Sequence, residues 1–176
     1  MADLSQRAGL KRPTVSVLIG ELLAASIAQE NGTNQDTGGR HARSFGLATE
    51  AFRAIGVNIY RGGVHTAFTD LAGKVLKLQQ KAIHPGDIDL AHVQQLIEET
   101  LKDPECDRPV LGIGVGTPGP IDLYHGSVLN PPDFPGMWGV ALGSALAQTS
   151  NLPVRIDDDA RVGSPAISFA YQWVPV

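Results

Sequence analysis

The spacing of apolar residues predicts helices at the start of the chain. Within residues 13–25 apolar side chains recur at steps of three and four, which predicts one buried face of a helix. That face comprises Val15, Leu18, Ile19, Leu22 and Leu23. Residues 3–8 predict a shorter helix ended by Gly9, and Pro13 is tolerated in the first turn of the second helix. Two helices joined by a tight turn with glycine follow the plan of a helix-turn-helix.

Two extended stretches come next, around residues 27–30 and 44–47, and a polar segment rich in Gly, Asn and Thr joins them. This pattern predicts a β-hairpin wing, so residues 1–49 are expected to form a winged helix-turn-helix, whose second helix enters the DNA major groove. The alternative is a plain amphipathic helix pair followed by a loop. Donors for phosphates and base edges are the candidate DNA-binding residues. They are Lys11, Arg12, Thr14 and Ser16 on the second helix, and Arg40, His41 and Arg43 in the hairpin.

Residues 50–176 show an alternating pattern of strands and helices. Strands are predicted at residues 54–59, 64–71, 75–82, 110–116 and 153–156. A helix with Asp89 as its cap carries Leu90, Val93, Leu96, Ile97 and Leu101 on one face, and a second helix covers about residues 142–148. Hairpin strands followed by a helix and a fully apolar strand predict an α/β lobe whose central strand is buried.

The composition is consistent with this fold and indicates in which cellular compartment the protein is expected. The chain has 176 residues, 43% of them apolar and 18% charged, which is typical of a folded, water-soluble protein. No apolar run approaches the roughly 18 residues that span a bilayer, and the first residues lack a secretory signal, so a cytoplasmic protein is expected. The single cysteine, Cys106, has no disulfide partner and is expected to be a surface thiol. No metal site is predicted.

Two segments contain candidate ligand-binding or catalytic residues. Residues 117–122, TPGPID, form a rigid loop after the most apolar strand, and the carboxyl ends of such strands are where α/β sheets bind ligands. A plain turn is the alternative. Asp157, Asp158 and Asp159 follow the last strand. Such a run can be a metal site, a catalytic base with neighbours, or a solvated charge cluster, but no His, Cys or partner acid lies at ligand spacing beside it, which argues against a metal.

In this order, the segments resemble the ROK family, named for its repressors, open reading frames and sugar kinases. GLKRPTVSVLIGELL and GGRHARSFGL are similar to the recognition helix and wing of its sugar-repressor branch. GIGVGTPGPID, PPDFPGMW and LPVRIDDDA are similar to the signature of its first lobe. The resemblance extends from about Leu4 to Arg161. It implies an α/β protein, with a partial winged helix-turn-helix at 1–49 followed at 50–176 by the first lobe of an actin-like or ribonuclease H-like ATPase fold.

The chain departs from the family kinases at the phosphate loop. Those kinases carry an Asp-x-Gly loop after the first strand, where glycine backbone approaches ATP and the acid helps to hold magnesium. Here Asn58 stands in the place of the acid and Tyr60 in that of the glycine. Because phosphoryl transfer depends on positioning and on metal neutralisation, the loop is expected to be disabled. The alternative is a shifted phosphate loop made by Gly62 and Gly63.

The family's sugar-contacting pattern is Asn-Asp-Ala-Asn, and this chain alters it. Asp159 matches the acid that serves as base in the kinases, Asp158 replaces the first Asn and Arg161 the second. A carboxylate accepts hydrogen bonds from hydroxyls but lacks the donors of an amide. Asp133 likewise stands where the family often has a sugar-contacting Asn. The resemblance thus implies a sugar site formed by Pro118, Gly119, Asp133, Asp158 and Asp159.

We therefore expect a sugar-responsive repressor that binds a sugar without phosphorylating it, and not an enzyme. Its expected partners are double-stranded operator DNA, a small sugar effector and a second copy of the chain, with no cofactor and no membrane. The alternative is a sugar kinase that uses ATP and magnesium, with Asp159 as base; a third alternative is an inert remnant or a dimerisation partner. A first helix of the winged domain, the second lobe and the family's zinc-binding segment are missing from this sequence, so a fragment or a truncated member is expected.

Overall fold

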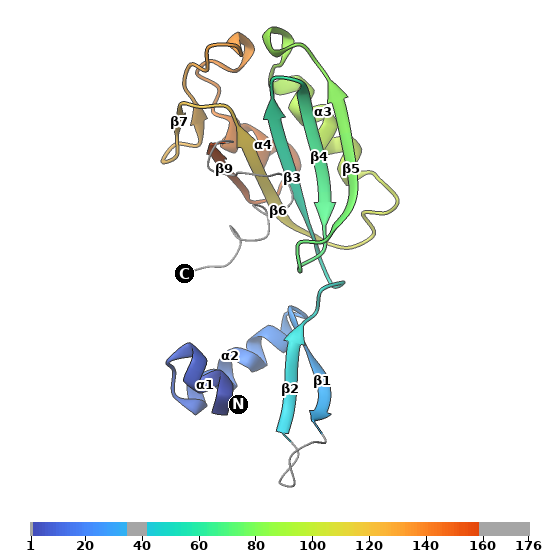
Figure 1. The fold of residues 1–176 in the computed structure, drawn as a ribbon, viewed down its shortest axis with the longest axis vertical. Coiled ribbons are helices and arrows are strands. Elements are labelled where there is room, and N and C mark those ends of the chain that lie inside the picture. Colours follow the sequence, from blue (N-terminus) through green and yellow to red (C-terminus); the bar gives the residue numbers. More distant parts are fainter. Residues whose placement is uncertain (1, 35–41, 159–176) are drawn as a thin grey trace. The chain divides into compact units, whose positions relative to one another are not determined.

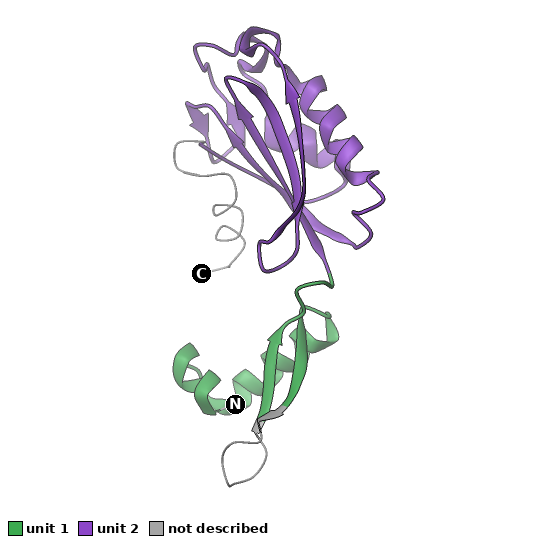
Figure 2. Ribbon diagram, turned by 45° about the vertical axis from the view of Figure 1, so that its right-hand side comes forward, with its two compact units in different colours: residues 1–51 green, residues 52–176 purple. Residues whose placement is uncertain are grey.

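The computed structural model describes residues 2–34 and 42–158, and the chain divides into two compact units at residues 1–51 and 52–176 (Figure 2). Unit 1 contains helices α1 (Ala2–Ala8) and α2 (Arg12–Ala24) and the antiparallel strands β1 (Ala28–Asn34) and β2 (Ala42–Leu47) (Figure 1). Gly9 takes a φ of 65° after α1, and the Leu10 amide donates to the Ser5 carbonyl at 3.1 Å. Glycine tolerates this left-handed conformation, so it ends the helix where the sequence predicts.

The predicted buried face of α2 is only partly buried. Val15 is 4% exposed, and Ile19 and Leu23 are half-buried, but Leu18 and Leu22 remain 42% and 38% exposed. Among the described residues, α2 packs against α1 and β1. Those two elements cover one side of the helix, and an apolar face is buried only where a neighbour lies against it.

Unit 2 contains a five-stranded sheet in the order β5-β4-β3-β6-β9 (Figure 1). Its strands are β3 (Arg53–Tyr60), β4 (Gly63–Thr69), β5 (Val75–Ala82), β6 (Val110–Thr117) and β9 (Val154–Asp158). β3, β4 and β5 are antiparallel neighbours, whereas β6 runs parallel to both β3 and β9. β4 ends two residues before the predicted position because the Asp70 carboxylate accepts the amides of Ala72 and Lys74, both at 2.9 Å, and turns the chain.

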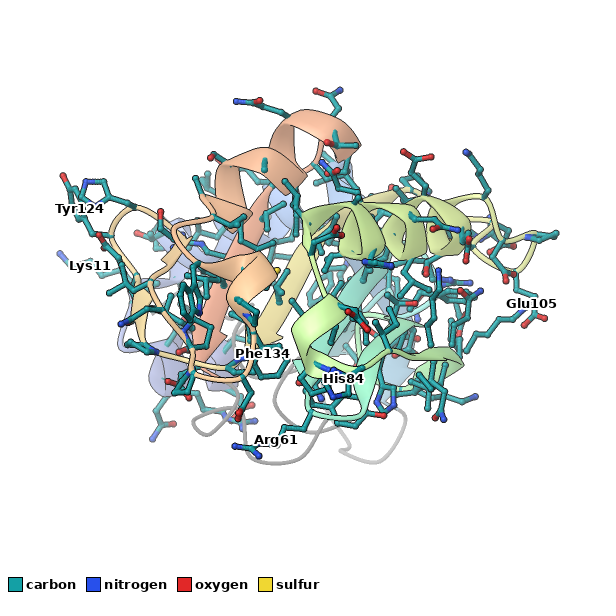
Figure 3. All side chains as sticks on the ribbon, turned by 90° about the horizontal axis from the view of Figure 1, so that it is seen from above. Lys11, Arg61, His84, Glu105, Tyr124 and Phe134 are labelled. Atoms are coloured by element: carbon teal, nitrogen blue, oxygen red, sulfur yellow. The ribbon has the colours of Figure 1, made fainter. Side chains whose placement is uncertain are left out.

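The helices of unit 2, α3 (Leu90–Leu101) and α4 (Leu142–Ser150), lie on the same face of the sheet (Figure 3). The buried side chains of the strands alternate and meet the helices there, as the Thr66 and Thr100 hydroxyls show at 2.7 Å. The core includes Ile55, Val57 and Ile59 of β3, Val64 and Phe68 of β4, Ile113 and Val115 of β6, Val93, Leu96 and Ile97 of α3, and Leu142 and Leu146 of α4.

The long connection between β6 and β9 carries the remaining short elements. They are β7 (Ile121–Asp122), β8 (Ser127–Val128) and the 3₁₀ turn η2 (Pro135–Met137); a further 3₁₀ turn, η1 (Pro85–Asp87), precedes α3. Val128, Phe134 and Met137 from this connection are at most 2% exposed. They anchor the loop in the core, so it is held close to the ends of the strands.

Asp89 caps α3 as the sequence predicts, because its side chain accepts the His92 amide at 3.0 Å. That hydrogen bond lowers the pKa of Asp89. We expect Asp89→Ala to lower the free energy of unfolding by about 1 kcal/mol, measured by urea denaturation at pH 7. The pKa of Asp89 in the folded protein lies below its pKa in the unfolded chain, which is about 3.9. The stabilisation by the cap is therefore fully present above the unfolded pKa and is lost as the pH falls through the folded pKa. Asp87→Ala, at an exposed acid before the helix, is the control, and an equal loss there would contradict the cap.

Candidate functional site

The start of α2 gathers the first group of predicted DNA-binding residues. Lys11 is the extended residue before the helix, with φ −70° and ψ 145°, and Arg12 opens it. Lys11, Arg12, Thr14 and Ser16 are all exposed. Backbone N–H groups at a helix start attract anions, and these side chains add two positive charges and two hydroxyl donors there. The arrangement suits contact with a phosphate backbone.

The hairpin supplies only one described member of the second group. Arg43 lies on β2 with its side chain 71% exposed and forms an ion pair with Glu30 of β1 at 3.5 Å. An exposed ion pair of this kind is weak, so a phosphate can compete for the arginine. Arg40 and His41 lie outside the described residues.

In unit 2 the carboxyl ends of three strands meet at one edge of the sheet. β6 lies between β3 and β9 and is parallel to both, with Asn58 beside Gly116 and Thr117 beside Asp158. The turn after β3, the loop after β6 and the end of β9 are therefore neighbours. This edge is where parallel strands present ligand-binding loops.

Pro118, Gly119 and Asp158 come together at this edge. A side chain carbon at Gly119 would meet the Asp158 carboxylate, so the glycine leaves room for that carboxylate beside the loop. The peptide bond from Gly119 to Pro120 is cis. Asp159 lies outside the described residues.

Asp133, which was predicted to contact a sugar, forms an ion pair with a side chain of another loop. Its carboxylate forms an ion pair with Arg61 in the turn between β3 and β4, and the two side chains are 43% and 80% exposed. Figure 3 labels Arg61 and Phe134, the residue after Asp133. Arg61 was not among the predicted site residues. Because the pair joins two loops far apart in the sequence, no local pattern signals it.

Thr117 is a second residue that sequence reasoning missed. It is fully buried at the end of β6, and its hydroxyl has no hydrogen-bond partner among the described residues. Such a group costs about 1–3 kcal/mol, and unsatisfied polar atoms often mark functional sites. Its register partner is Asp158, so this hydroxyl belongs to the same strand edge.

The turn at the predicted degenerate phosphate loop is filled by Tyr60. A side chain carbon added at Gly62 would lie 2.5 Å from Cε2 of the Tyr60 ring, which also packs 4.4 Å from the His65 ring, centroid to centroid. Gly63 has a φ of 136°, and a side chain there would strike the Lys81 carbonyl of β5. Both glycines therefore have structural reasons that involve no phosphate.

These residues do not fit magnesium-bound ATP. Asn58 is half-buried and carries no charge for a cation, and the tyrosine ring covers the glycine that would approach a phosphate. Across the described parts of the chain, no three His, Cys, Asp or Glu side chains are grouped as metal ligands. The structure thus supplies no phosphoryl-transfer step at this turn.

Asp122, which follows the Pro-Gly-Pro loop, has a lowered pKa. The His125 ring nitrogen lies 2.5 Å from its carboxylate, and the His125 and Tyr124 amides donate to it at 3.1 and 2.9 Å. The His125 side chain, followed by these backbone donors, lowers the pKa of Asp122. The carboxylate therefore fixes the turn between β7 and β8.

Cys106 differs from its prediction as a surface thiol. It is half-buried and packs against the core of unit 2, and burial raises the pKa of its thiol. A protonated, half-buried thiol is a poor nucleophile.

None of the helices in the described residues combines the length and the apolar character needed to cross a membrane.

Comparison with known proteins bears out the predicted resemblance. Residues 54–171 match the model of the ROK family. Over 175 residues the chain is 29% identical to a xylose repressor from Caldicellulosiruptor bescii, an alignment that covers 97% of this chain and 43% of the repressor. The chain thus spans less than half the length of that relative.

Solved structures confirm the predicted fold class. A crystal structure of a ROK family transcriptional regulator, a homologue of E. coli Mlc, superposes with a TM-score of 0.76 at 25% identity, over 92% of this chain and 41% of that one. A ROK hexokinase from Thermus thermophilus has a TM-score of 0.53 at 21% identity, over 61% of this chain and 35% of the hexokinase. At that identity the second likeness shows the fold alone.

The two glycines of the turn are expected to respond differently to alanine. Gly63→Ala meets backbone at a positive φ, so we expect it to lower the free energy of unfolding by about 2 kcal/mol or more, measured by urea denaturation. Gly62→Ala meets only the Tyr60 ring, so its smaller cost should disappear in a Tyr60→Ala background. An undiminished cost in that background would contradict the contact between Tyr60 and Gly62.

Proposed function

This chain belongs to the ROK family, and we propose that it supplies the DNA-binding unit and the first sensor lobe of a sugar-responsive transcriptional repressor. One observation carries the proposal: a helix-turn-helix with a β-hairpin shares the chain with a ROK lobe whose phosphate turn is filled by Tyr60. The similarity to a xylose repressor and to a ROK transcriptional regulator supports the same conclusion.

The proposed DNA contact is made by the start of α2 and by the hairpin. Lys11 and Arg12 contact phosphates, while Thr14 and Ser16 reach base edges in the major groove. Arg43 exchanges Glu30 for a phosphate, and Arg40 and His41 extend the contact. Symmetric half-sites call for two reading heads, so the protein acts as a homodimer, in the cytoplasm.

The proposed sugar site is the strand edge where Pro118, Gly119 and Asp158 meet. Asp158 accepts hydrogen bonds from sugar hydroxyls, and Asp159, the next residue in the sequence, is proposed as a further acceptor. Asp133 reaches the sugar by exchanging Arg61 for a hydroxyl. This exchange costs little, because an exposed ion pair contributes about 0–1 kcal/mol.

Binding without chemistry is what a sensor requires. A sugar shifts a two-state equilibrium by its difference in affinity for the two states, and no bond to phosphate is needed. Asn58 and Tyr60 remove the means of phosphorylation, whereas the acids retain the means of recognition. The relative's name makes xylose the first sugar to test.

DNA binding is expected to depend on the start of α2. Lys11→Ala with Arg12→Ala should weaken binding to DNA from upstream of the protein's own gene, and should make the slope of log K against log salt shallower by about 2, because two phosphate contacts are lost. Fluorescence anisotropy over a salt series measures both effects. Arg108→Ala, an exposed arginine in unit 2, is the control and should change neither. An unchanged slope in the double variant would exclude this surface.

Sugar binding is expected to depend on Asp158. Titration calorimetry with xylose and a panel of other aldoses should find a ligand whose affinity falls at least about tenfold in Asp158→Ala, because a hydrogen bond to a charged group is lost. Asp87→Ala, an exposed acid outside the site, should bind the sugar normally. A coupled assay with ATP should detect no phosphorylation. Turnover that Asp159→Asn abolishes would overturn the proposal in favour of a sugar kinase.

A further inference from the structure

Trp138 is a large aromatic side chain that the fold leaves in contact with water. It follows η2 in the connection between β6 and β9 and is 54% exposed, whereas Phe134 and Met137 of the same turn are at most 2% exposed. The turn therefore directs two apolar side chains into the core and leaves the largest one outside. A single exposed apolar residue is common in folded proteins, so exposure alone assigns no role to it.

Hydrogen bonds tie the indole ring to the backbone of its own turn. The indole Nε1 group donates to the Pro131 carbonyl at 2.8 Å, and the same carbonyl accepts the Phe134 amide at 3.1 Å. Pro131 is buried, and the Trp138 amide donates to the Pro135 carbonyl at 3.2 Å. Because its one polar group is bonded to backbone, the ring presents apolar surface to the solvent. A ring held in this way loses little conformational entropy when a ligand covers it.

The turn that holds the ring also carries Asp133. Pro131 accepts the indole hydrogen bond, and Asp133 is the second residue after it. The Asp133 carboxylate pairs with Arg61, which directly follows β3, so this carboxylate lies at the edge of the sheet where the parallel strands end. An aromatic ring and a carboxylate are thus carried by one hydrogen-bonded turn at that edge.

A second set of hydrogen bonds connects Trp138 to the loop after β6. The amide of Gly139, the next residue, donates to the Leu129 carbonyl at 2.9 Å, and the Leu129 amide donates to the Pro120 carbonyl at 3.0 Å. Pro120 closes the Pro-Gly-Pro loop, which lies beside the Asp158 carboxylate. Trp138 is therefore connected through the backbone to both carboxylate-bearing parts of the proposed sugar site.

This combination of groups suits a sugar ring. A pyranose has a rim of hydroxyl groups, which donate hydrogen bonds to carboxylates, and faces formed by C–H groups, which are favourably removed from water. Small-molecule sites combine apolar and aromatic surface with a few well-placed polar groups. Asp133 and Asp158 supply acceptors only, so they can recognise hydroxyls but offer nothing to the C–H face. An exposed aromatic ring supplies that missing surface.

We propose that Trp138 is a further sugar-binding residue, whose ring packs against the C–H face of the sugar while the carboxylates accept its hydroxyls. The inference rests on the proposed function, because it concerns the same ligand. It adds a specificity: the favoured ligand is a cyclic sugar with an unobstructed C–H face, such as xylose, and not an open-chain polyol with the same hydroxyls.

Truncation of the ring tests this contact. Trp138→Ala should weaken binding of xylose, or of whichever aldose of the panel binds, about tenfold, because apolar area covered in the complex is lost. Trp138→Phe keeps a ring and should bind within about threefold of the unchanged protein. Titration calorimetry measures these constants, and the preference for xylose over xylitol should shrink in Trp138→Ala. Tyr124→Ala removes a ring that is 92% exposed outside the site, and this control should bind normally.

Fluorescence gives a second readout that a merely structural role would not change. The chain has two tryptophans, Trp138 and Trp173, so Trp173→Phe leaves Trp138 as the single emitter. A saturating concentration of the same aldose should lower the acrylamide quenching constant of this variant, because the sugar shields the ring from the quencher. The measurement leaves Trp138 in place, so it decides the question even if circular dichroism shows that Trp138→Ala is unfolded.

The outcomes separate this inference from the proposed function. Sugar binding that depends on Asp158 but is unchanged in a folded Trp138→Ala, or quenching that the bound sugar leaves unchanged, would overturn the role of Trp138 and leave the proposed function standing. A protein that binds none of the aldoses would overturn both. Quenching of Trp138 that falls with rising protein concentration in the absence of sugar would show that a protein surface covers the ring, and this result would also overturn the inference.

Discussion

The parallel pairing of β6 with β3 on one side and β9 on the other is the constraint on which unit 2 depends. Parallel strands end at the same edge, so three connections far apart in the sequence are brought together there. Packing of α3 and α4 on one face fixes the register by burying Ile55, Val57, Ile113 and Val115. Each candidate sugar contact in unit 2 follows from that arrangement or is attached to it through the loop anchored by Phe134.

The same edge bears on the proposed sensor role, in which a sugar is bound without being phosphorylated. Tyr60 lies against Gly62, where a phosphate would need the space, and Asn58 supplies no charge for a cation. Opposite them, Gly119 still admits the Asp158 carboxylate, and the pair of Arg61 with Asp133 is exposed enough to exchange partners. Recognition of hydroxyl groups needs only well-placed acceptors and donors, whereas phosphoryl transfer also needs a metal and a cleared loop, so the second capacity is the easier to remove.

Much of the fold was predictable because its signals are local. Helix spacing, the Asp89 cap, the glycine after α1 and the hairpin strands each depend on residues within one or two turns of each other, and the structure has all of them. The burial of α2 was overestimated, since periodicity states which side of a helix is apolar but not whether a neighbour covers it. The Cys106 thiol was misplaced for the same reason, because burial is decided by the packing of distant segments.

By itself the sequence determined the order of the elements, the family, and the chemical types available at the strand ends, since these depend on local spacing and on side-chain identity. Only the tertiary structure decided which of those groups meet. The pairing of Arg61 with Asp133, the burial of the Thr117 hydroxyl and the approach of Gly119 to the Asp158 carboxylate arise where separate segments come into contact. Such contacts are set by how loops and strands pack in three dimensions, and no period along the chain records them.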